Sequence, residues 1–427
     1  MKRLLSLLLC AVLALFCATT AQAAGVSITL TASEYALHYA FDAGAQDPFV
    51  ILEYATPAEK GWMMLYSADG HFEGDVSLTY SGAGGKTSVA LTSARTTGSI
   101  GKASTTLPKA ADYQKPTGKS NAKVTDFVLT ETPEGFHYAF NAIGTDYMLL
   151  YWRSKEQTVT QPVYPDENGH YEGDVVSELT FARTQFTVQV KSGSGSMKKE
   201  ATVRKGYQAP EAPQRQEGRL SGVTVCIDAG HQENGRFVNE PIGPGLTGST
   251  SGKGGMAQGT KTNRRESIVC LEIGMLLRDE LLRQGANVIM TREDQTTFHT
   301  NIERCEIAEA GGAQIMLRLH CNNSSNHSKR GIQVYGPLNS DYAKAVADAD
   351  TYREMGQKLL DAMKTRVGMT LAKSTGMVRL NDNYVGNNWA KMMCFLVEMG
   401  YLSNPAEEYL LVTPVYQQWL AEGMADG

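Results

Sequence analysis

Hydrophobic and polar positions follow two different periods along the chain, and the period changes near residue 220. Before that point apolar residues occupy every second position, as in SLTY (77–80) and FTVQV (186–190), between turn clusters rich in Gly, Asp and Asn. Such alternation, with β-branched and aromatic residues and a turn about every ten residues, predicts antiparallel strands. The N-terminal half is therefore expected to be an all-β region.

This β region consists of two copies of one unit. LHYAFDAG (37–44) recurs as FHYAFNAIG (136–144), and GHFEGDV (70–76) recurs as GHYEGDV (169–175). The repeat predicts two tandem antiparallel β-sandwich modules of immunoglobulin or fibronectin-like size, at residues 24–117 and 118–217. Segments containing Lys and Pro, at 107–123 and 208–219, are expected to be semi-rigid spacers.

After residue 220 short apolar strands alternate with helices. Strands are expected at 223–227, 287–290, 315–319, 332–335 and 393–397. The clearest helix spans 266–285, where Val269, Ile273 and Leu277 share one face before Gly285 stops the helix. This order predicts an α/β domain at 218–427 with a central, largely parallel sheet flanked by helices.

The first 23 residues have the pattern of a secretory signal peptide. A basic pair at residues 2 and 3 precedes an apolar run over 4–18, and AQA at 21–23 resembles a cleavage site. A membrane anchor is the less favoured alternative, because the run is short for a span of about 20 residues. No later segment is apolar enough to cross a membrane, so we expect a secreted or extracytoplasmic protein without a stable membrane span.

Composition and charge narrow the range of functions. The chain has 427 residues, 42% of them hydrophobic and 20% charged, which is globular composition with room for about three domains. The net charge of −5 gives no basic field, so nucleic acid is not an expected partner. Two of the seven cysteines lie in the leader, and the remaining five are expected to be buried free thiols. The chain ends soon after its last expected helix, so no further domain is expected.

Two features of the β modules have alternative interpretations. Trp62 and Trp152 are either a platform for stacking on sugars or, as is more usual for aromatic residues in apolar strands, part of the core. The recurring histidines, His38 with His137 and His71 with His170, are explained equally well by duplication and by metal binding.

Candidate chemistry gathers where strands of the α/β domain end. His231 follows the first strand, His320 closes LRLH and Glu398 closes FLVE, while Glu266 opens the long helix. Two imidazoles and a carboxylate with one open position form the ligand set of a catalytic zinc site, and a further carboxylate is the usual base beside it. Taken singly, these residues could instead close turns or complement a helix dipole.

The C-terminal part resembles the zinc-dependent N-acetylmuramoyl-L-alanine amidases, the catalytic domains of bacterial cell-wall lytic enzymes. The resemblance rests on seven blocks in the family order: IDAGH (227–231), ESIVCLEI (266–273), MTRED (290–294), IERCEIA (302–308), LRLHCNN (317–323), GIQVY (331–335) and LVEMGYLSNPAEE (396–408). It implies one Zn²⁺ held by His231, Glu266 and His320, with Glu398 as the catalytic base. It also implies hydrolysis of the amide between the lactyl group of N-acetylmuramic acid and L-Ala of the stem peptide.

Other roles within the resemblance are less defined. Asp228 is expected either to accept a hydrogen bond from a ligand imidazole or to cap its turn, and Arg304 and Asn322 are candidates for supporting or substrate-contact roles. The segment from 232 to 265 is longer and richer in Gly and Pro than is common in the family. It is either a substrate-gripping or gating loop or a flexible excursion.

Three functions remain in view from the sequence. The first is a secreted peptidoglycan amidase whose β modules contact the cell wall. The second is a zinc peptidase that cuts within the stem peptide, and the third is a non-catalytic wall-binding protein with an amidase-like domain. The complete set of four site residues argues against the third.

Overall fold

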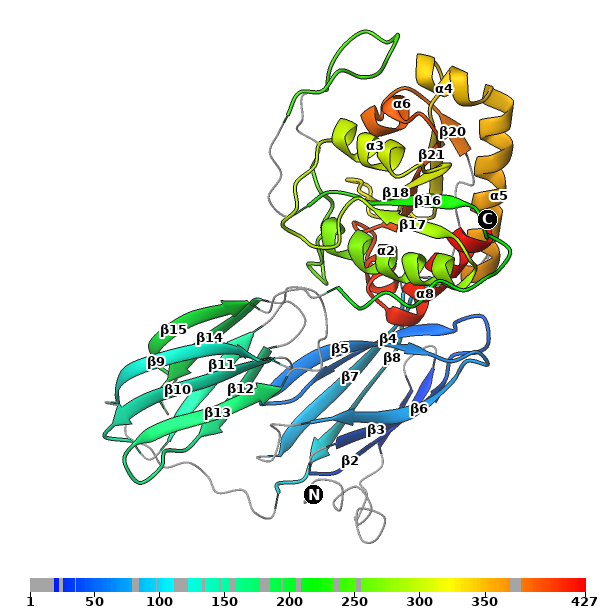
Figure 1. Cartoon of the computed structure of the whole chain (residues 1–427). Coiled ribbons are helices and arrows are strands. Elements are labelled where there is room, and N and C mark those ends of the chain that lie inside the picture. The colour runs from blue at the N-terminus through cyan, green and yellow to red at the C-terminus, as the bar shows by residue number, and fades with distance from the viewer. Residues whose placement is uncertain are drawn as a thin grey trace. The chain divides into compact units, whose positions relative to one another are not determined.

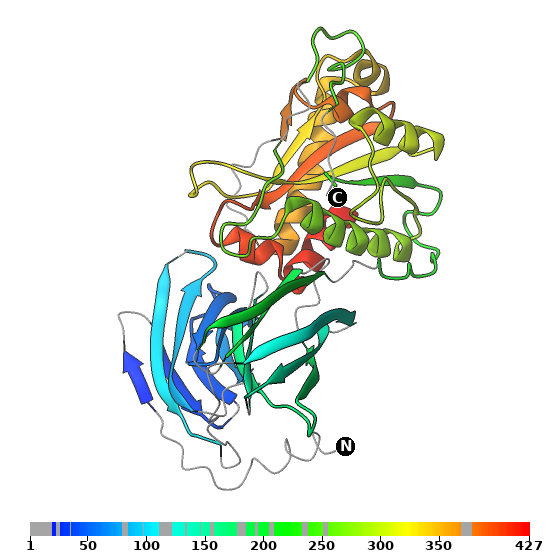
Figure 2. The same ribbon diagram turned by 90° about the vertical axis from the view of Figure 1, so that its left-hand side faces the viewer.

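The computed structural model divides the chain into two compact units, Met1–Gly206 and Tyr207–Gly427. It describes residues 19–22, 26–34, 36–78, 84–96, 98–110, 122–132, 135–145, 147–153, 158–176, 185–192, 195–204, 209–232, 238–250, 255–368 and 378–427 (Figures 1 and 2). Most of the expected signal peptide therefore lies outside the described residues. Its residues 19–22 form a strand that pairs with the strand at 27–32.

The described part of the N-terminal unit is built from strands. They are β1 (Thr19–Gln22), β2 (Ser27–Ala32), β3 (Ala36–Asp42), β4 (Phe49–Ala55), β5 (Glu59–Tyr66), β6 (His71–Ser77), β7 (Gly85–Ser93), β8 (Ser99–Leu107), β9 (Lys123–Thr132), β10 (Gly135–Ile143), β11 (Met148–Arg153), β12 (Thr158–Val163), β13 (His170–Val176), β14 (Gln185–Lys191) and β15 (Met197–Arg204). All their pairings are antiparallel, as the period-two pattern predicts.

Each sequence repeat packs two sheets around one core. In the first repeat β2-β3-β6 faces β5-β4-β7-β8, and in the second β9-β10-β13 faces β12-β11-β14-β15, so the strand order is the same. Each core contains residues from both of its sheets, such as Leu30 with Leu52 and Phe136 with Trp152. The side chain of Trp152 is wholly buried, which confirms the core interpretation for this residue.

The two repeats are joined through their edge strands. β12 pairs with β5 through Thr158↔Lys60 and Val159↔Glu59, and Thr160 N donates to Ala58 O over 2.9 Å. This pairing fuses four strands of each repeat into one eight-stranded sheet. Both repeats consequently fall in one compact unit.

The C-terminal unit alternates strands and helices. Its strands are β16 (Thr224–Ala229), β17 (Asn287–Met290), β18 (Ile315–Asn322), β19 (Gln333–Gly336), β20 (Val378–Leu380) and β21 (Met393–Tyr401). Its helices are α2 (Glu266–Arg283), α3 (Asn301–Ala310), α4 (Asp341–Val346), α5 (Ala349–Val367), α6 (Val385–Trp389), α7 (Glu407–Leu411) and α8 (Pro414–Asp426). The five expected strands and the long helix are confirmed, whereas the three-residue β20 was too short for its pattern to reveal.

These strands form one mixed sheet in the order β17-β16-β18-β21-β19-β20, in which β19 pairs antiparallel with β21 and the other pairs are parallel. Helices cover both faces (Figure 1). Cys226 and Met316 pack in one cluster with Cys305 of α3, while the adjacent Ile227 lies on the opposite face against Gly274 of α2. β16 therefore contributes side chains to the cores on both faces of the sheet, which explains its nearly continuous apolar sequence.

The segment expected to be a spacer before this domain is fixed along α2. Gln216 N donates to Leu282 O over 3.0 Å, and the Arg278 guanidinium donates to Pro210 O over 2.9 Å. The described part of this segment, from residue 209 onwards, therefore packs with the C-terminal unit.

The cysteines at positions 226, 270, 305, 321 and 394 are free and buried, as expected. Among the described helices, none combines the length and the apolar character needed to cross a bilayer.

Candidate active site

Segments distant in sequence meet where the parallel strands end. His231 lies two residues beyond β16, His320 lies in β18, and Glu266 is the first residue of α2. The register of β18 with β21 places Glu398 beside His320. In an open α/β sheet this carboxyl edge is where functional groups gather, because the loops that follow the strands converge there.

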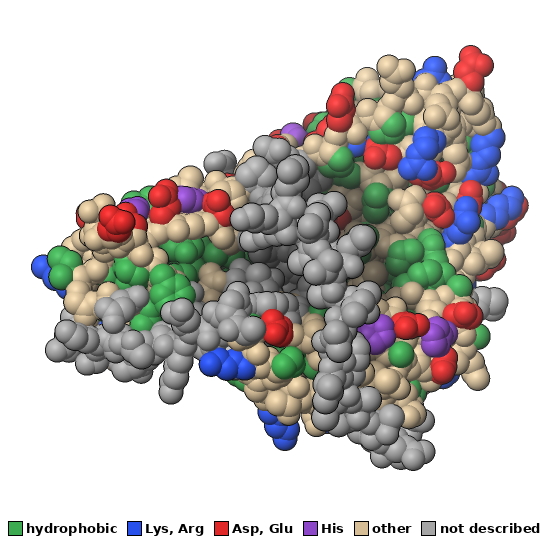
Figure 3. Space-filling model, turned by 90° about the horizontal axis from the view of Figure 1, so that it is seen from below, with side chains coloured by type: hydrophobic (Ala, Val, Ile, Leu, Met, Phe, Trp, Pro, Cys, Tyr) green, Lys and Arg blue, Asp and Glu red, His purple; other side chains and the backbone are tan. Residues whose placement is uncertain are grey.

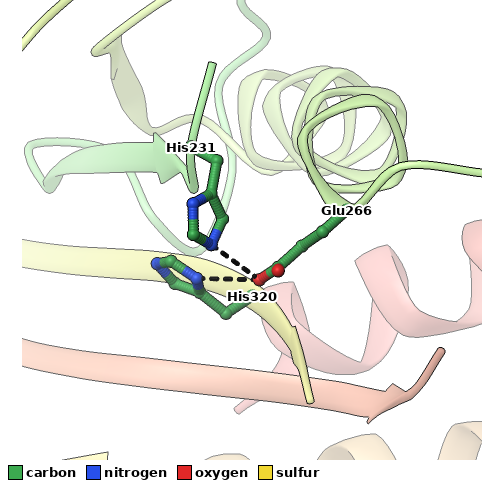
Figure 4. A group of neighbouring side chains, drawn as sticks. All are labelled: His231, Glu266 and His320. Atoms are coloured by element: carbon green, nitrogen blue, oxygen red, sulfur yellow. Dashed lines mark hydrogen bonds and ion pairs between the residues drawn. The ribbon is translucent and has the colours of Figure 1, made fainter. Parts of the chain in front are cut away.

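The two imidazoles point at one oxygen of Glu266 (Figure 4). Nε2 of His231 lies 3.1 Å, and Nδ1 of His320 lies 3.0 Å, from Oε1 of Glu266. One candidate ligand atom from each of the three residues lies within 4.8 Å of the other two. The structure therefore brings together the three residues that the sequence selected as ligands.

This group fits a metal ion by its own chemistry. The atoms that converge are Nε2 of His231, Nδ1 of His320 and an oxygen of Glu266, and all three can ligate a metal. Burial lowers the pKa of His320 and thus favours the neutral imidazole, the form that ligates metals. Two neutral nitrogens and one carboxylate oxygen are the donor set of a three-ligand zinc site.

The two carboxylates of the site have opposite electrostatic surroundings. Burial opposes ionisation of Glu266, but interactions with His231 and His320 outweigh it and hold the pKa of Glu266 below its ordinary value. Burial, reinforced by the charge of Glu266, raises the pKa of Glu398 well above its ordinary value. Oε2 of Glu398 is buried without a hydrogen-bond partner among the described residues. Glu266 is thus suited to ligation and Glu398 to proton transfer.

The site opens into a groove of about 540 Å³. That volume is within the usual range for a ligand site. Besides the four residues above, its walls include Gln232, Thr300, Asn322 and Tyr384. Parts of the long loop, including Val238, Glu240 and Ala257, also line it.

Comparison with known proteins finds a family that matches the C-terminal part of the chain. Residues 225–427 match the family model described as N-acetylmuramoyl-L-alanine amidase. We call the C-terminal unit, which carries this match, the amidase-family domain.

Individual relatives are similar to this chain at low sequence identity. The "Probable cell wall amidase LytH" of Staphylococcus aureus is 26% identical over 217 residues, which cover 50% of this chain and 60% of the relative. An N-acetylmuramoyl-L-alanine amidase from Clostridium difficile 630 is similar at 24% identity, over 48% of this chain and 92% of that one, with a TM-score of 0.38. The amidase Ami1 from Mycobacterium abscessus is 18% identical over 48% of this chain and 97% of its own, with a TM-score of 0.43.

Close packing explains why the residue directly before His231, Gly230, has no side chain. A Cβ on Gly230 would collide with the carbonyl oxygen of Leu319 and lie 2.6 Å from Cε1 of His320. His231 itself has a φ of 57°, in the left-handed region that few non-glycine residues adopt. Surrounding contacts must therefore hold this turn in place.

Two buried arginines supply those contacts. Arg292 donates from Nε to Ala229 O and from Nη2 to Gly230 O, both over 2.8 Å. Arg304 donates from Nη2 to His231 O over 3.1 Å and also binds the Gln232 side chain. Arg304 is therefore a positioning residue for the ligand turn. Arg292 was not selected from the sequence, although the MTRED block contains it.

Asp228 has a different role from either one expected. Its Oδ1 accepts from Thr291 over 2.8 Å and from Arg304, and its Oδ2 accepts from Arg318 over 2.8 Å. Both oxygens are thus occupied by these groups, and the expected hydrogen bond to a ligand imidazole is replaced by ion pairs. The reason is the register, which sets Asp228 directly beside Arg318 on β18.

Asn322 lies at the rim of the groove. Its amide donates to Oε1 of Gln333 over 3.3 Å, and its Oδ1 accepts from Asn323 N over 2.9 Å. A register shift between His320 and Asn322 interrupts the pairing of β18 with β21 at this point. The residue therefore shapes the end of the strand that carries His320.

The described parts of the long loop are anchored by two buried acids. Glu240 accepts from Ile302 N over 2.8 Å, at the start of α3. Glu408 accepts from Lys261 N over 2.8 Å and from Thr262 N over 3.0 Å. The loop reaches the ligand set as well, since Ala257 N donates to Oε2 of Glu266 over 2.7 Å. Among its described residues, Val238, Glu240, Thr250, Gly255 and Ala257 line the groove.

We expect Gly230→Ala to weaken zinc binding by about 10- to 100-fold, the usual effect of disturbing the groups around metal ligands. The new Cβ displaces the His320 ring, which lies 2.6 Å from its position. Titration of the metal-free protein with Zn²⁺ measures the effect. Gly255→Ala is the control, because nothing lies within 4 Å of its added Cβ. Equal affinity in both variants would contradict the close-approach argument.

Asp228→Asn should destabilise the amidase-family domain by about 3–5 kcal/mol, because two buried guanidiniums lose their carboxylate partner. Burial opposes ionisation of Asp228, but Arg304 and Arg318 hold its pKa below the ordinary value. Its stabilisation is therefore present above the unfolded pKa of about 4 and is lost as the pH falls towards the folded value.

Denaturant unfolding at neutral and acid pH measures this contribution. The difference between wild type and Asp228→Asn should shrink as the pH falls below about 4. Glu293→Gln is the control, since Glu293 is exposed and lies 3.7 Å from Arg278. A constant difference across the pH range would show that charge is not the cause.

Proposed function

We propose that this protein is a zinc-dependent peptidoglycan hydrolase that cleaves the amide between N-acetylmuramic acid and L-Ala of the stem peptide. The observation that carries the proposal is the convergence of His231, Glu266 and His320 beside Glu398 in a domain of the amidase family. The chain covers only 60% of the length of the curated relatives it matches, so the proposal rests on the site together with the family.

The mechanism assigns one task to each group. His231, Glu266 and His320 would hold Zn²⁺, which would supply Lewis-acid activation of the scissile carbonyl and of water near neutral pH. Glu398 takes the proton of the attacking water, and its raised pKa makes its carboxylate a stronger base that keeps this proton until the next step. It then gives that proton to the departing nitrogen of L-Ala, because an amide nitrogen leaves readily only when protonated.

Two alternatives predict different products. A zinc peptidase would shorten the stem peptide, whereas an amidase releases it whole with a free L-Ala amino terminus. A wall-binding protein without catalysis would release neither. The four convergent groups and the groove beside them favour catalysis.

Glu398→Gln should lower wall hydrolysis by about 10²- to 10⁴-fold, the usual share of a general acid–base group. Mass spectrometry of products from purified peptidoglycan measures the loss, and the zinc content should stay unchanged because Glu398 is not a ligand. Glu306→Gln, at an exposed position of α3, is the matched control. Shortened stem peptides from wild type would refute the amidase assignment, and full activity in Glu398→Gln would refute the base.

We also propose the arrangement of the rest of the chain: a signal peptide over 1–23, modules over 24–117 and 118–217, and the amidase domain over 218–427. The sheet pairs β2-β3-β6 and β5-β4-β7-β8, repeated in the second module, support an immunoglobulin or fibronectin-like sandwich. Cleavage of the signal would place the protein outside the cytoplasm, where its substrate lies.

The modules are proposed to hold the enzyme on the cell wall. In a His231→Ala background, full-length protein should sediment with purified wall sacculi, and a chain lacking residues 24–206 should sediment less. Thermal unfolding of the shortened chain checks that its amidase domain is intact. Equal sedimentation of both chains would reject wall contact by the modules.

A further inference from the structure

The histidines of the β modules pair with acids at the surface (Figure 3). Nδ1 of His38 lies 3.0 Å from Asp75 Oδ1, and Nδ1 of His137 lies 2.9 Å from Asp174 Oδ1. The pair recurs at the same place in both copies of the repeat, so it belongs to the surface of the repeated fold. Polar groups that face a ligand lie instead in the groove of the amidase-family domain, beside Glu398.

A chain of hydrogen bonds runs from the rim of this groove to Tyr384. Asn323 N donates to Asn322 Oδ1 over 2.9 Å, and Asn322 Nδ2 lies 3.3 Å from Gln333 Oε1. The hydroxyl of Tyr335 lies 2.5 Å from the same Gln333 oxygen, and it is also hydrogen-bonded to the hydroxyl of Tyr384. The rings of the two tyrosines meet edge to face, with their centroids 5.1 Å apart.

The strand register places this chain beside the proposed catalytic base. Gln333 is the partner of Glu398 where β19 pairs with β21. Tyr335 lies two residues further along β19 and projects from the same face of the sheet as Gln333. Tyr384 directly precedes α6 and lines the groove together with Glu398. A substrate that fills the groove at Glu398 therefore meets the Tyr384 side chain.

The direction of each bond in the chain follows from its first member. A backbone N–H can only donate, so the Asn322 atom that faces Asn323 N is the carbonyl oxygen, and the other is the NH₂ group. The NH₂ group also only donates, so the Gln333 atom that faces it is the amide oxygen. That oxygen can only accept, so Tyr335 gives its proton to Gln333. The hydrogen-bond network thus assigns both amide orientations.

Tyr384 is left with lone pairs alone. Burial, reinforced by the charge of Glu398, raises the pKa of Tyr335. Burial, reinforced by Tyr335 and Glu398, likewise raises the pKa of Tyr384, so each phenol keeps its one proton. Tyr335 uses its proton on Gln333, and in the bond between the two hydroxyls Tyr384 must therefore be the donor. The Tyr384 oxygen can then only accept hydrogen bonds from the groove.

An oxygen that only accepts discriminates among its partners. It attracts an N–H or O–H group and repels a carbonyl or ether oxygen. A sugar hydroxyl can turn either to donate or to accept, so a fixed acceptor adds little selectivity for it. A peptide N–H can only donate, and the stem peptide offers one at each amide. The fixed acceptor therefore fits the peptide part of the substrate best.

We propose that Tyr384 positions the substrate by accepting a hydrogen bond from an N–H of the stem peptide. Asn322, Gln333 and Tyr335 are positioning residues, because they commit the Tyr384 proton and so fix the polarity of its oxygen. This inference rests on the proposed amidase function and extends it to the recognition of the peptide.

Binding to an inactive variant tests the proposal without turnover. Full-length, zinc-loaded Glu398→Gln protein is titrated with an N-acetylmuramoyl tripeptide and with three analogues, each with one amide replaced by an ester. Each ester exchanges an N–H for an oxygen and keeps the length of the backbone. We expect one analogue to bind about 10-fold more weakly than the amide, because a hydrogen bond is lost and two acceptors face each other.

Adding Tyr384→Phe should abolish this preference for the amide, since the ring remains on Tyr335 but the acceptor is gone. Adding Tyr335→Phe should reduce it, because the freed Tyr384 proton can turn towards the ester oxygen. Tyr342→Phe, on α4 and outside the lining of the groove, is the matched control and should keep the full preference. An equal preference with and without the Tyr384 hydroxyl would overturn the proposal, and an unchanged preference in Tyr335→Phe would overturn the assigned polarity.

Two further arms separate this inference from its neighbours. Analogues that each lack one sugar hydroxyl test the glycan as the source of the donor. A loss of affinity that appears only with such an analogue, and only when Tyr384 is present, would show that the peptide assignment is wrong. The products that wild-type protein releases from peptidoglycan test the amidase function separately. No release by wild type, together with a Tyr384-dependent preference for the amide, would refute that function and leave the acceptor in place.

Discussion

The geometry of the catalytic edge depends on one buried carboxylate. Asp228 has no exposed surface, and Arg304 and Arg318 neutralise it from α3 and from the neighbouring strand. A buried charge is tolerated only with such partners. The pairing also directs the Arg304 guanidinium to the carbonyls of Ala229 and His231, which fixes the left-handed turn that presents the first ligand. An ion pair within the core thus determines the position of a side chain in the groove.

The same site illustrates how surroundings divide roles among identical groups. Glu266 accepts N–H donors from Ala257 and Cys321 and faces two imidazoles, all of which favour its ionised form. Glu398 is buried beside a negative charge, and its Oε2 has no hydrogen-bond partner within the described part of the chain, so its protonated form is favoured. Two glutamates of ordinary chemistry are thereby suited to the two roles proposed for them, a metal ligand and a proton carrier.

Sequence patterns were sufficient to predict the strands of the α/β domain. Runs such as 315–319 are buried on both faces of the sheet and therefore appear in the sequence as continuous apolar segments. They also selected His231, Glu266 and His320, through spacing at strand ends and the family blocks. They did not reveal the pairing of Asp228 with Arg318, which depends on strand register, nor the contact of Ala257 with Glu266, which depends on how a long loop folds back. Contacts that depend on strand register or on backbone amides leave no local pattern in the amino-acid sequence. The fusion of the two repeats was hidden for the same reason, since β5 and β12 are far apart in the sequence.

That fusion has a consequence for the solubility of a duplicated sandwich. The outer strand of an open sheet presents unpaired N–H and C=O groups that can recruit strands of other molecules. A lone copy would expose the whole edge of β5 or β12 in this way, but in tandem the two strands pair over the first two residues of each. Duplication thus supplies every molecule with its own complementary strand. Separating the copies would restore two adhesive edges, so the pair is expected to be inherited as a unit.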